Sequence, residues 1–250
     1  MSDAPPLLLL TNDDGYQARG LCALAEALAE LGEVWIVAPQ QQMSGVSHAI
    51  SLHRPVRAAH FAERSVWVDG TPADCIYCAL GHFLPRPPTL VLSGINHGPN
   101  LGDDIFYSGT MAAAVEACLA GYSAMALSAG WQADMDVSAA AIVPLVAEAL
   151  DHPMPERTLL NVNIPSTLAA AWRFCNAALG PRPYPKVVER RVDPRGADYY
   201  WIGGANLPPS GNPHSDCAIV DRGEISVSAL RLDWGCRDAA QWLATWPSIA

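Results

Sequence analysis

Residues 7–16 read LLLLTNDDGY, an apolar run that ends in two adjacent aspartates and a glycine. A run of this length, bounded by a turn residue, predicts a buried β-strand. The next residues, YQARGLCALAEALAELG, carry leucine and alanine at helical spacing and predict a helix that begins near Arg19. The unit is therefore a strand, an acidic turn and a helix. In open α/β sheets, the loop after such a strand is where ligands bind.

The Asp13-Asp14 pair is the first candidate site. Neighbouring side chains on a strand point to opposite faces, so both carboxylates can meet at one point only where the chain has begun to turn. Gly15 allows that turn because glycine tolerates backbone angles that other residues avoid. Aspartate is also common at helix starts, which leaves a capped turn as the alternative. The second, adjacent carboxylate favours a functional site.

Strand and helix patterns alternate over residues 1–180. The expected strands are short apolar runs: Leu7–Thr11, EVWIVAP from Glu33, TLVLSGI from Thr89, SAMALSA from Ser123 and TLLNVNI from Thr158. The expected helices begin near Arg19, Pro72, Gly109 and Val137. This alternation predicts an α/β fold, with a mostly parallel sheet and helices on both faces.

The composition changes from about Gly180 onwards. The segment GPRPYPKVVERRVDPRGADYYWIGG is rich in proline, arginine and aromatic residues and predicts an extended hairpin that leaves the core. We expect short strands at CAIV from Cys217 and EISVSAL from Glu224, and a final helix over residues 238–246. The chain is therefore divided into an α/β core with the ligand site (1–180) and a region of hairpin, short strands and helix (181–250).

Composition and charge restrict the class of protein. The 250 residues suit one large domain or a domain with an appendage, and half of them are hydrophobic. The net charge of −10 and pI near 5.0 argue against a nucleic-acid polymer or an anionic membrane as partner. Seven scattered cysteines, an odd number, indicate reduced thiols. Signal-peptide and membrane-spanning patterns are absent, so we expect a soluble, intracellular protein.

Two further loops after expected strands carry polar residues. Ser44-Gly45 follows EVWIVAP, and Asn96 and Asn100 follow TLVLSG. Because the carboxyl ends of parallel strands share one sheet edge, the fold brings both loops to the aspartate turn. Two carboxylates, a hydroxyl and an amide oxygen suit a hard cation such as Mg²⁺ or Mn²⁺. Zinc would need a histidine or thiolate spacing that this sequence does not show.

An anion site is expected where Ser108-Gly109-Thr110 opens an alanine-rich helix. Backbone N–H groups at a helix start bind phosphate well. An ordinary cap is the alternative, and the neighbouring cation site favours phosphate. Neither G-x-x-x-x-G-K-[ST] nor G-x-G-x-x-G occurs, so the signatures of P-loop NTPases and dinucleotide-binding enzymes are absent.

Several stretches follow one another along residues 7 to about 230: TNDDG, VAP followed by SGVSHAIS, GTPADC, LVLSGINHGPNLGDDIFYSGTMAAAVEA, DPRGADYYWIGG and EISVSAL. Together they resemble the survival protein SurE family of metal-dependent 5′-nucleotidases. The resemblance implies a Rossmann-like core, hydrolysis of nucleoside monophosphates and one divalent cation, Mg²⁺ or Mn²⁺, per subunit. It also implies a cytoplasmic homodimer or homotetramer whose extended C-terminal segments reach between subunits.

The resemblance also implies roles for individual residues. The family's metal ligands fall on Asp13, Asp14, Ser44 and Asn96. Either aspartate is a candidate to orient or deprotonate the attacking water. The expected substrate-binding residues are Asn100, Ser108, Gly109 and Thr110. Hydrolysis of 3′-nucleotides and of short polyphosphate stays open, and a nucleotide-sensing module without turnover is the alternative function.

Two features differ from what members of this family commonly carry. The loop before Ser44 reads Gln40-Gln41-Gln42-Met43 in place of basic residues, and Arg19 stands where proline is frequent. Because a guanidinium offers two parallel donors to phosphate oxygens, Arg19 is a candidate for part of the missing positive charge. The alternative is a solvated residue in the first helical turn.

Overall fold

The computed structural model describes residues 4–182, 187–203, 212–233, 235–236, 239, 242–246 and 248. The strands are β1 (Leu7–Thr11), β2 (Glu33–Pro39), β3 (Ala58–Ala62), β4 (Ser65–Val68), β5 (Leu90–His97), β6 (Ala124–Ala129), β7 (Thr158–Ile164), β8 (Phe174–Asn176), β9 (Val188–Val192), β10 (Asp198–Ile202) and β11 (Ile225–Arg231). The helices are α1 (Arg19–Leu28), α2 (Pro72–Cys78), α3 (Gly109–Leu119), α4 (Met135–Asp151) and α5 (Asp216–Asp221), with a π-helical turn η1 (Ala79–Phe83) and a 3-10 turn η2 (Gly102–Phe106).

One nine-stranded sheet forms the centre of the molecule, in the order β3-β4-β2-β1-β5-β6-β7-β11-β8. The strands from β4 to β7 in this order are parallel to one another. The other three strands run in the opposite direction: β3 is antiparallel to β4, and β11 is antiparallel to β7 and parallel to β8. The expected α/β fold with a mostly parallel sheet is confirmed.

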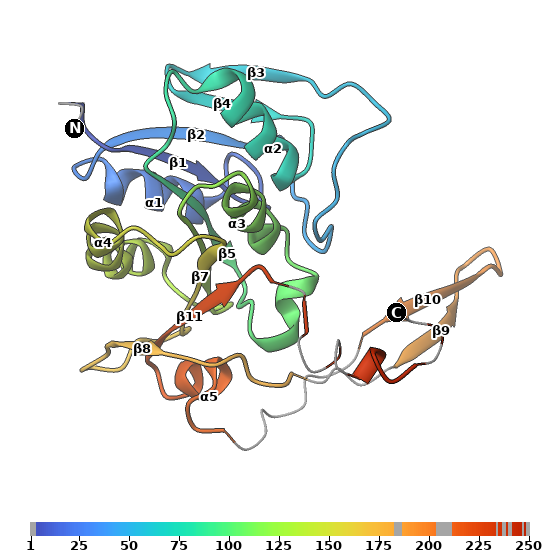
Figure 1. The fold of residues 1–250 in the computed structure, drawn as a ribbon. Helices are drawn as coiled ribbons and strands as arrows, with labels where there is room; N and C mark the ends of the chain where they lie inside the picture. The colour runs from blue at the N-terminus through green and yellow to red at the C-terminus, as the bar shows by residue number, and fades with distance from the viewer. Residues whose placement is uncertain are drawn as a thin grey trace.

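Helices cover both faces of this sheet (Figure 1). One face packs against α1 and α4, and the other against α2 and α3. Successive leucines of β1 alternate between the two cores: Leu8 and Leu10 face α1 and α4, whereas Leu9 faces α2 and α3. A strand buried on both faces needs apolar residues at every position, which explains the continuous leucine run.

All strands and helices expected in the first 180 residues are present with small shifts at their ends, whereas β3, β4 and β8 were not expected. Helices α1, α2 and α3 begin at the expected residues, and α4 begins at Met135, two residues before the expected start. The earlier start of α4 follows from Asp134, whose side chain accepts hydrogen bonds from the N–H groups of Asp136 and Val137. The division of the chain at residue 180 remains a prediction.

The C-terminal part combines a hairpin with a return to the main sheet. β9 and β10 form the expected antiparallel hairpin, and β11 is the strand expected from Glu224. The strand expected at CAIV is wrong, because these residues lie in helix α5. Ser215 caps that helix by accepting a hydrogen bond from the Ala218 N–H at 3.2 Å, and a four-residue apolar run does not by itself distinguish strand from helix.

Two further expectations concern the C-terminus and membranes. The helix expected over residues 238–246 includes positions outside the described residues. In the part of the chain that the structure describes, no helix is both long enough and apolar enough to cross a membrane.

Candidate functional site

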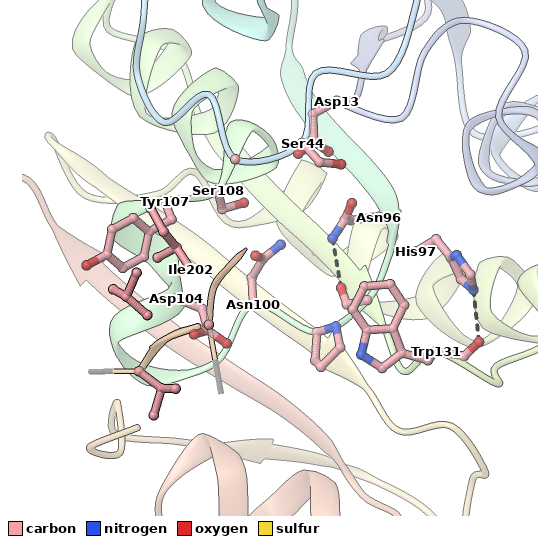
Figure 2. Close-up of a pocket in the computed structure, with 16 residues that line it drawn as sticks. Asp13, Ser44, Asn96, His97, Asn100, Asp104, Tyr107, Ser108, Trp131 and Ile202 are labelled. Atoms are coloured by element: carbon pink, nitrogen blue, oxygen red, sulfur yellow. Dashed lines mark hydrogen bonds between the residues drawn. The ribbon is translucent and has the colours of Figure 1, made fainter. Parts of the chain in front are cut away.

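A cavity of about 680 Å³ opens at the carboxyl-terminal edge of the sheet (Figure 2). β1 pairs with β2 on one side and with β5 on the other, and such a switch point leaves a crevice outside the strand ends. The cavity is lined by the loops after β1, β2, β5 and β6, by the start of α3 and by the hairpin. The lining residues are Asp13, Ser44, Gly45, Asn96, His97, Gly98, Pro99, Asn100, Asp104, Tyr107, Ser108, Trp131, Val187, Val188, Ile202 and Gly203.

The turn after β1 is built by Asn12. Its buried side chain donates from Nδ2 to the Gly15 carbonyl at 2.9 Å and accepts from the Gly15 N–H at 3.2 Å. Gly15 has a φ of 99°, a conformation that favours glycine. The chain therefore leaves the strand at Asn12. Asp13 and Asp14 then no longer have to point to opposite faces of the sheet, which agrees with the turn predicted at this position.

Asp13 is the most enclosed charged group of the site. The residue is only 3% exposed, and its Oδ1 accepts a hydrogen bond from the Thr110 hydroxyl at 2.6 Å. Burial raises the pKa of Asp13 to about 6; the hydrogen bond from Thr110 opposes this increase, and neighbouring Asp14 adds to it. A Cβ on Gly109 would lie 2.8 Å from the Asp13 Cβ, so the glycine allows the helix start to approach this carboxylate.

Asp14 lies on the β5 side of the same turn. Its Oδ2 accepts a hydrogen bond from the His97 backbone N–H at 2.9 Å, and it is less buried than Asp13. Asp14 is not among the residues that line the cavity. The two aspartates are thus held by different elements, Asp13 by the start of α3 and Asp14 by the end of β5.

Ser44 reaches the cavity from the loop after β2, and Asn96 from the last residues of β5. The loop before Ser44 is fastened to the aspartate turn by the Met43 N–H, which donates to the Asp13 carbonyl at 2.7 Å. The Asn96 Nδ2 donates to the Gly98 carbonyl at 2.8 Å, which fixes the amide orientation. Figure 2 shows the Asn96 oxygen on the side of Ser44 and Asp13. Three of the four expected metal ligands therefore line one cavity, and Asp14 flanks it.

The start of α3 forms another part of the lining. Ser108 caps the helix, because its hydroxyl accepts from the Met111 N–H at 3.1 Å. The hydroxyl of Thr110 is fully buried and bonded to Asp13, so in this structure it orients a carboxylate. The first N–H groups of a helix have no partner within it, which leaves backbone donors at this end of α3. No lysine or arginine is among the described residues that line the cavity.

A buried network of amides beneath the cavity positions Asn100. The Asn100 carbonyl accepts from Asn161 Nδ2 at 2.9 Å and Asn163 Nδ2 at 3.0 Å, and the Asn100 N–H donates to Asn163 Oδ1 at 2.8 Å. The Asn100 side chain donates to the Ser128 hydroxyl at 2.8 Å. Sequence reasoning missed Asn161, Asn163 and Ser128. The two asparagines at alternate positions of an otherwise apolar strand, NVNI, were the available signal.

Asp216 is a second group that sequence reasoning missed. This fully buried carboxylate accepts from the Gly102 N–H at 2.7 Å and from the Gly180 N–H at 2.8 Å. Nearby, Arg182 donates to Asp104 at 2.6 Å. These contacts fasten η2, which follows the Asn100 loop, to the segment that leads into the hairpin.

Arg19 is not brought to the cavity. Its exposed guanidinium pairs with Asp136 at the start of α4 and lies 3.8 Å from Glu26. Within the described residues, the structure also contains no group of three histidine, cysteine or acidic side chains arranged as a metal site. A cation here would therefore depend on hydroxyl and amide oxygens in addition to the two aspartates.

Comparison with known proteins identifies the family. A family model described as Survival protein SurE matches residues 8–183. The 5′-nucleotidase SurE of Myxococcus xanthus (strain DK1622) is 47% identical over 237 residues, which cover 93% of this chain and 90% of that protein. The protein of the same name from Geotalea uraniireducens (strain Rf4) is 45% identical over 230 residues, with 90% and 93% covered.

A solved structure agrees with this result. The crystal structure of the SurE protein from Aquifex aeolicus superimposes with a TM-score of 0.83 at 37% identity, and the match covers 96% of this chain and 100% of that one. Sequence and fold therefore agree over nearly the whole length, and this chain belongs to the SurE family.

Proposed function

We propose that this chain is a metal-dependent 5′-nucleotidase that hydrolyses nucleoside 5′-monophosphates to nucleoside and phosphate. The observation that carries the proposal is the cavity in which Asp13, Ser44 and Asn96 meet the start of α3. Relatives that share 45–47% of its residues over most of the chain are named 5′-nucleotidase. The activity is that of a phosphoric monoester hydrolase.

The donor set fits one divalent cation per subunit, which we propose to be Mg²⁺ or Mn²⁺. Carboxylate, hydroxyl and amide oxygens are the ligands that these ions prefer. Asp13 is buried beside a second carboxylate, and among the described residues neither Asp13 nor Asp14 forms an ion pair with lysine or arginine. A buried carboxylate without a cationic partner is costly, so this site favours a cation. The proposed ligands are Asp13, Asp14, Ser44 and Asn96.

When bound, the cation would neutralise phosphate charge and lower the pKa of a water molecule. The protein's own groups then have separate tasks. Thr110 holds Asp13 in one orientation, and the His97 N–H holds Asp14. One of these aspartates orients or deprotonates the attacking water. Backbone N–H groups at Ser108-Gly109 donate to phosphate oxygens, where negative charge must be stabilised during the reaction.

Phosphate release tests the proposal directly. Protein stripped of metal is assayed with 5′- and 3′-mononucleotides and short polyphosphate, in the presence of Mg²⁺, Mn²⁺ or excess chelator. We expect 5′-mononucleotides to be hydrolysed only with metal. Binding of nucleotides without phosphate release would instead indicate a sensing module. Full activity in chelator would contradict the metal site.

We also propose that the chain is a cytoplasmic homodimer or homotetramer assembled through its C-terminal region. The hairpin β9–β10 exposes large apolar side chains on both strands, including Val188, Val192, Tyr200 and Ile202. Contiguous exposed apolar surface is typical of interaction sites. Light scattering on the intact protein, compared with a variant in which Val192 and Tyr200 are serine, measures the oligomeric state and the hairpin's part in it.

A further inference from the structure

The cavity is larger than a phosphate and one cation need. Its volume of about 680 Å³ lies in the range of sites for whole small-molecule ligands. Asp13, Ser44 and Ser108 occupy one end, and Trp131, Tyr107 and the hairpin residue Ile202 form the rim (Figure 2). The hairpin residue Val188 also lines the cavity. If the proposed function is correct, the phosphate lies at the first end and the nucleoside must extend toward the rim.

Trp131 is exposed and yet held in place. It follows β6 at the same sheet edge, and 66% of its surface is open to solvent although it lines the cavity. The His97 ring meets the indole edge-to-face at 5.4 Å between centroids, and His97 Nε2 lies 2.8 Å from the Trp131 carbonyl oxygen. Contacts to ring and backbone together limit the orientations that this large side chain can adopt.

Gly98 makes room for the indole. A Cβ at this position would lie 2.7 Å from Trp131 Cη2, and Gly98 has a φ of 130°, which also favours glycine. The Gly98 carbonyl in turn accepts the hydrogen bond from Asn96. The end of β5 and the residue after it, residues 96–98, therefore connect a proposed metal ligand to the face of the indole.

We propose that Trp131 is the stacking platform for the nucleobase and makes this site selective for purine nucleotides. This inference rests on the proposed function. It concerns the nucleobase, the part of the substrate that the metal end of the cavity cannot distinguish. An aromatic face binds any base by stacking, and a purine covers more of an indole than a pyrimidine does. Among the described residues that line the cavity, Trp131 and Tyr107 are the only large aromatic side chains apart from His97, and they lie on opposite sides in Figure 2.

The test compares Trp131→Ala, Trp131→Phe and the intact enzyme on AMP, UMP and ribose 5-phosphate, which carries the same ester without a base. Loss of stacking should raise KM for AMP about tenfold, with kcat nearly unchanged, because a base–aromatic contact contributes binding rather than chemistry. KM for UMP should rise less, and KM for ribose 5-phosphate should not change. Trp131→Phe should restore most of the AMP affinity.

One further measurement makes the test independent of turnover, and a control variant separates it from nonspecific effects of removing a tryptophan. Calorimetric titration of adenosine, which has no phosphate and needs no metal, should show weaker binding to Trp131→Ala than to the intact protein. Trp242→Ala removes an exposed tryptophan that does not line the cavity and should leave all of these constants unchanged.

The outcomes separate this inference from the proposed function. An intact enzyme that releases no phosphate from AMP overturns the function, while adenosine binding still tests the platform. Equal effects of Trp131→Ala on AMP and ribose 5-phosphate, or unchanged constants for AMP and adenosine, overturn the platform. So does a base-dependent loss that appears in Tyr107→Ala and not in Trp131→Ala.

Discussion

The floor and the rim of the cavity are built in opposite ways. The floor, which we define as the lining residues Asp13 and Asn100 together with Thr110, which supports Asp13 from the interior, is buried, and its side chains are held by hydrogen bonds within the protein. The rim, which we define as Tyr107, Trp131 and the hairpin residues, is exposed and largely apolar. The floor can fix the geometry of the reacting groups, whereas the rim can bind the base, which differs between nucleotide substrates.

The difference follows from the fold. The floor lies where β1, β5 and α3 meet, and its partners are residues of the central sheet such as Ser128, Asn161 and Asn163. Polar networks inside a protein are rigid when their members are satisfied. The rim lies on loops and on a two-stranded hairpin outside the main sheet, where the sequence is less constrained by packing. Floor substitutions should therefore impair all substrates alike, and rim substitutions should depend on the base.

The largest effect is expected for Asp14→Asn. This change removes one of two carboxylates from a partly exposed position, so it should leave folding intact. We expect at least about a 100-fold loss of kcat/KM with every substrate, because outer-shell changes alone commonly cost 10–100-fold. The control is Asp103→Asn, an exposed acid in η2. Retained activity, or a loss that depends on the base, would contradict the assignment of Asp14 to the metal end.

A smaller loss is expected for Gly109→Ala. The new Cβ would lie 2.8 Å from Asp13 Cβ and 3.0 Å from Asp13 Oδ2, so the carboxylate must move. Small displacements at a catalytic centre are expensive, and we expect kcat/KM to fall by about 10–100-fold on nucleotides and on ribose 5-phosphate alike. Gly81→Ala is the control, because its added Cβ would meet nothing within 4 Å beyond its chain neighbours and its own helical turn. A normal rate for Gly109→Ala would show that Asp13 need not hold this position.

The next prediction distinguishes two roles for Thr110. Valine has nearly the same size and fits this fully buried position, but it cannot donate to Asp13. If Thr110 positions a metal ligand, the metal concentration for half-maximal activity should rise about tenfold, and saturating metal should recover activity. Thr110→Ser should behave like the intact enzyme. A weaker inhibition by inorganic phosphate with unchanged metal dependence would instead support the direct phosphate contact expected from the sequence.

The floor was more predictable from sequence than the rim. A strand buried on both faces, followed by Asp13-Asp14 and Gly15, indicates a site at the sheet edge, and parallel topology brings Ser44 and Asn96 to the same place. Both inferences depend on local patterns and on one rule of fold geometry. Trp131 carries no such pattern, because a single tryptophan after a strand is compatible with packing, a surface or a binding site.

Hydrogen bonds between side chains and groups that are distant in the sequence could also not be predicted from sequence patterns. Thr110 read as a helix start that could bind phosphate, and only the packing of α3 against the β1 turn reveals its bond to Asp13. Asp216 accepts a hydrogen bond from the Gly102 N–H, although the two residues are more than one hundred positions apart in the sequence. The helix α5 was mistaken for a strand because its apolar run is too short to show a period.

The smallest effect is expected for Arg19→Ala, which tests whether the rim of the cavity extends to α1. Arg19 was a candidate to compensate for the glutamine-rich loop before Ser44, but its side chain is 55% exposed, pairs with Asp136 and does not line the cavity. Exposed ion pairs contribute little, so we expect unchanged kinetics on AMP and on p-nitrophenyl phosphate. A several-fold rise in KM for AMP alone would extend the rim to α1 and restore the compensation hypothesis. Unchanged constants would leave anion binding to the cation and to the start of α3, because the described cavity lining contains no lysine or arginine.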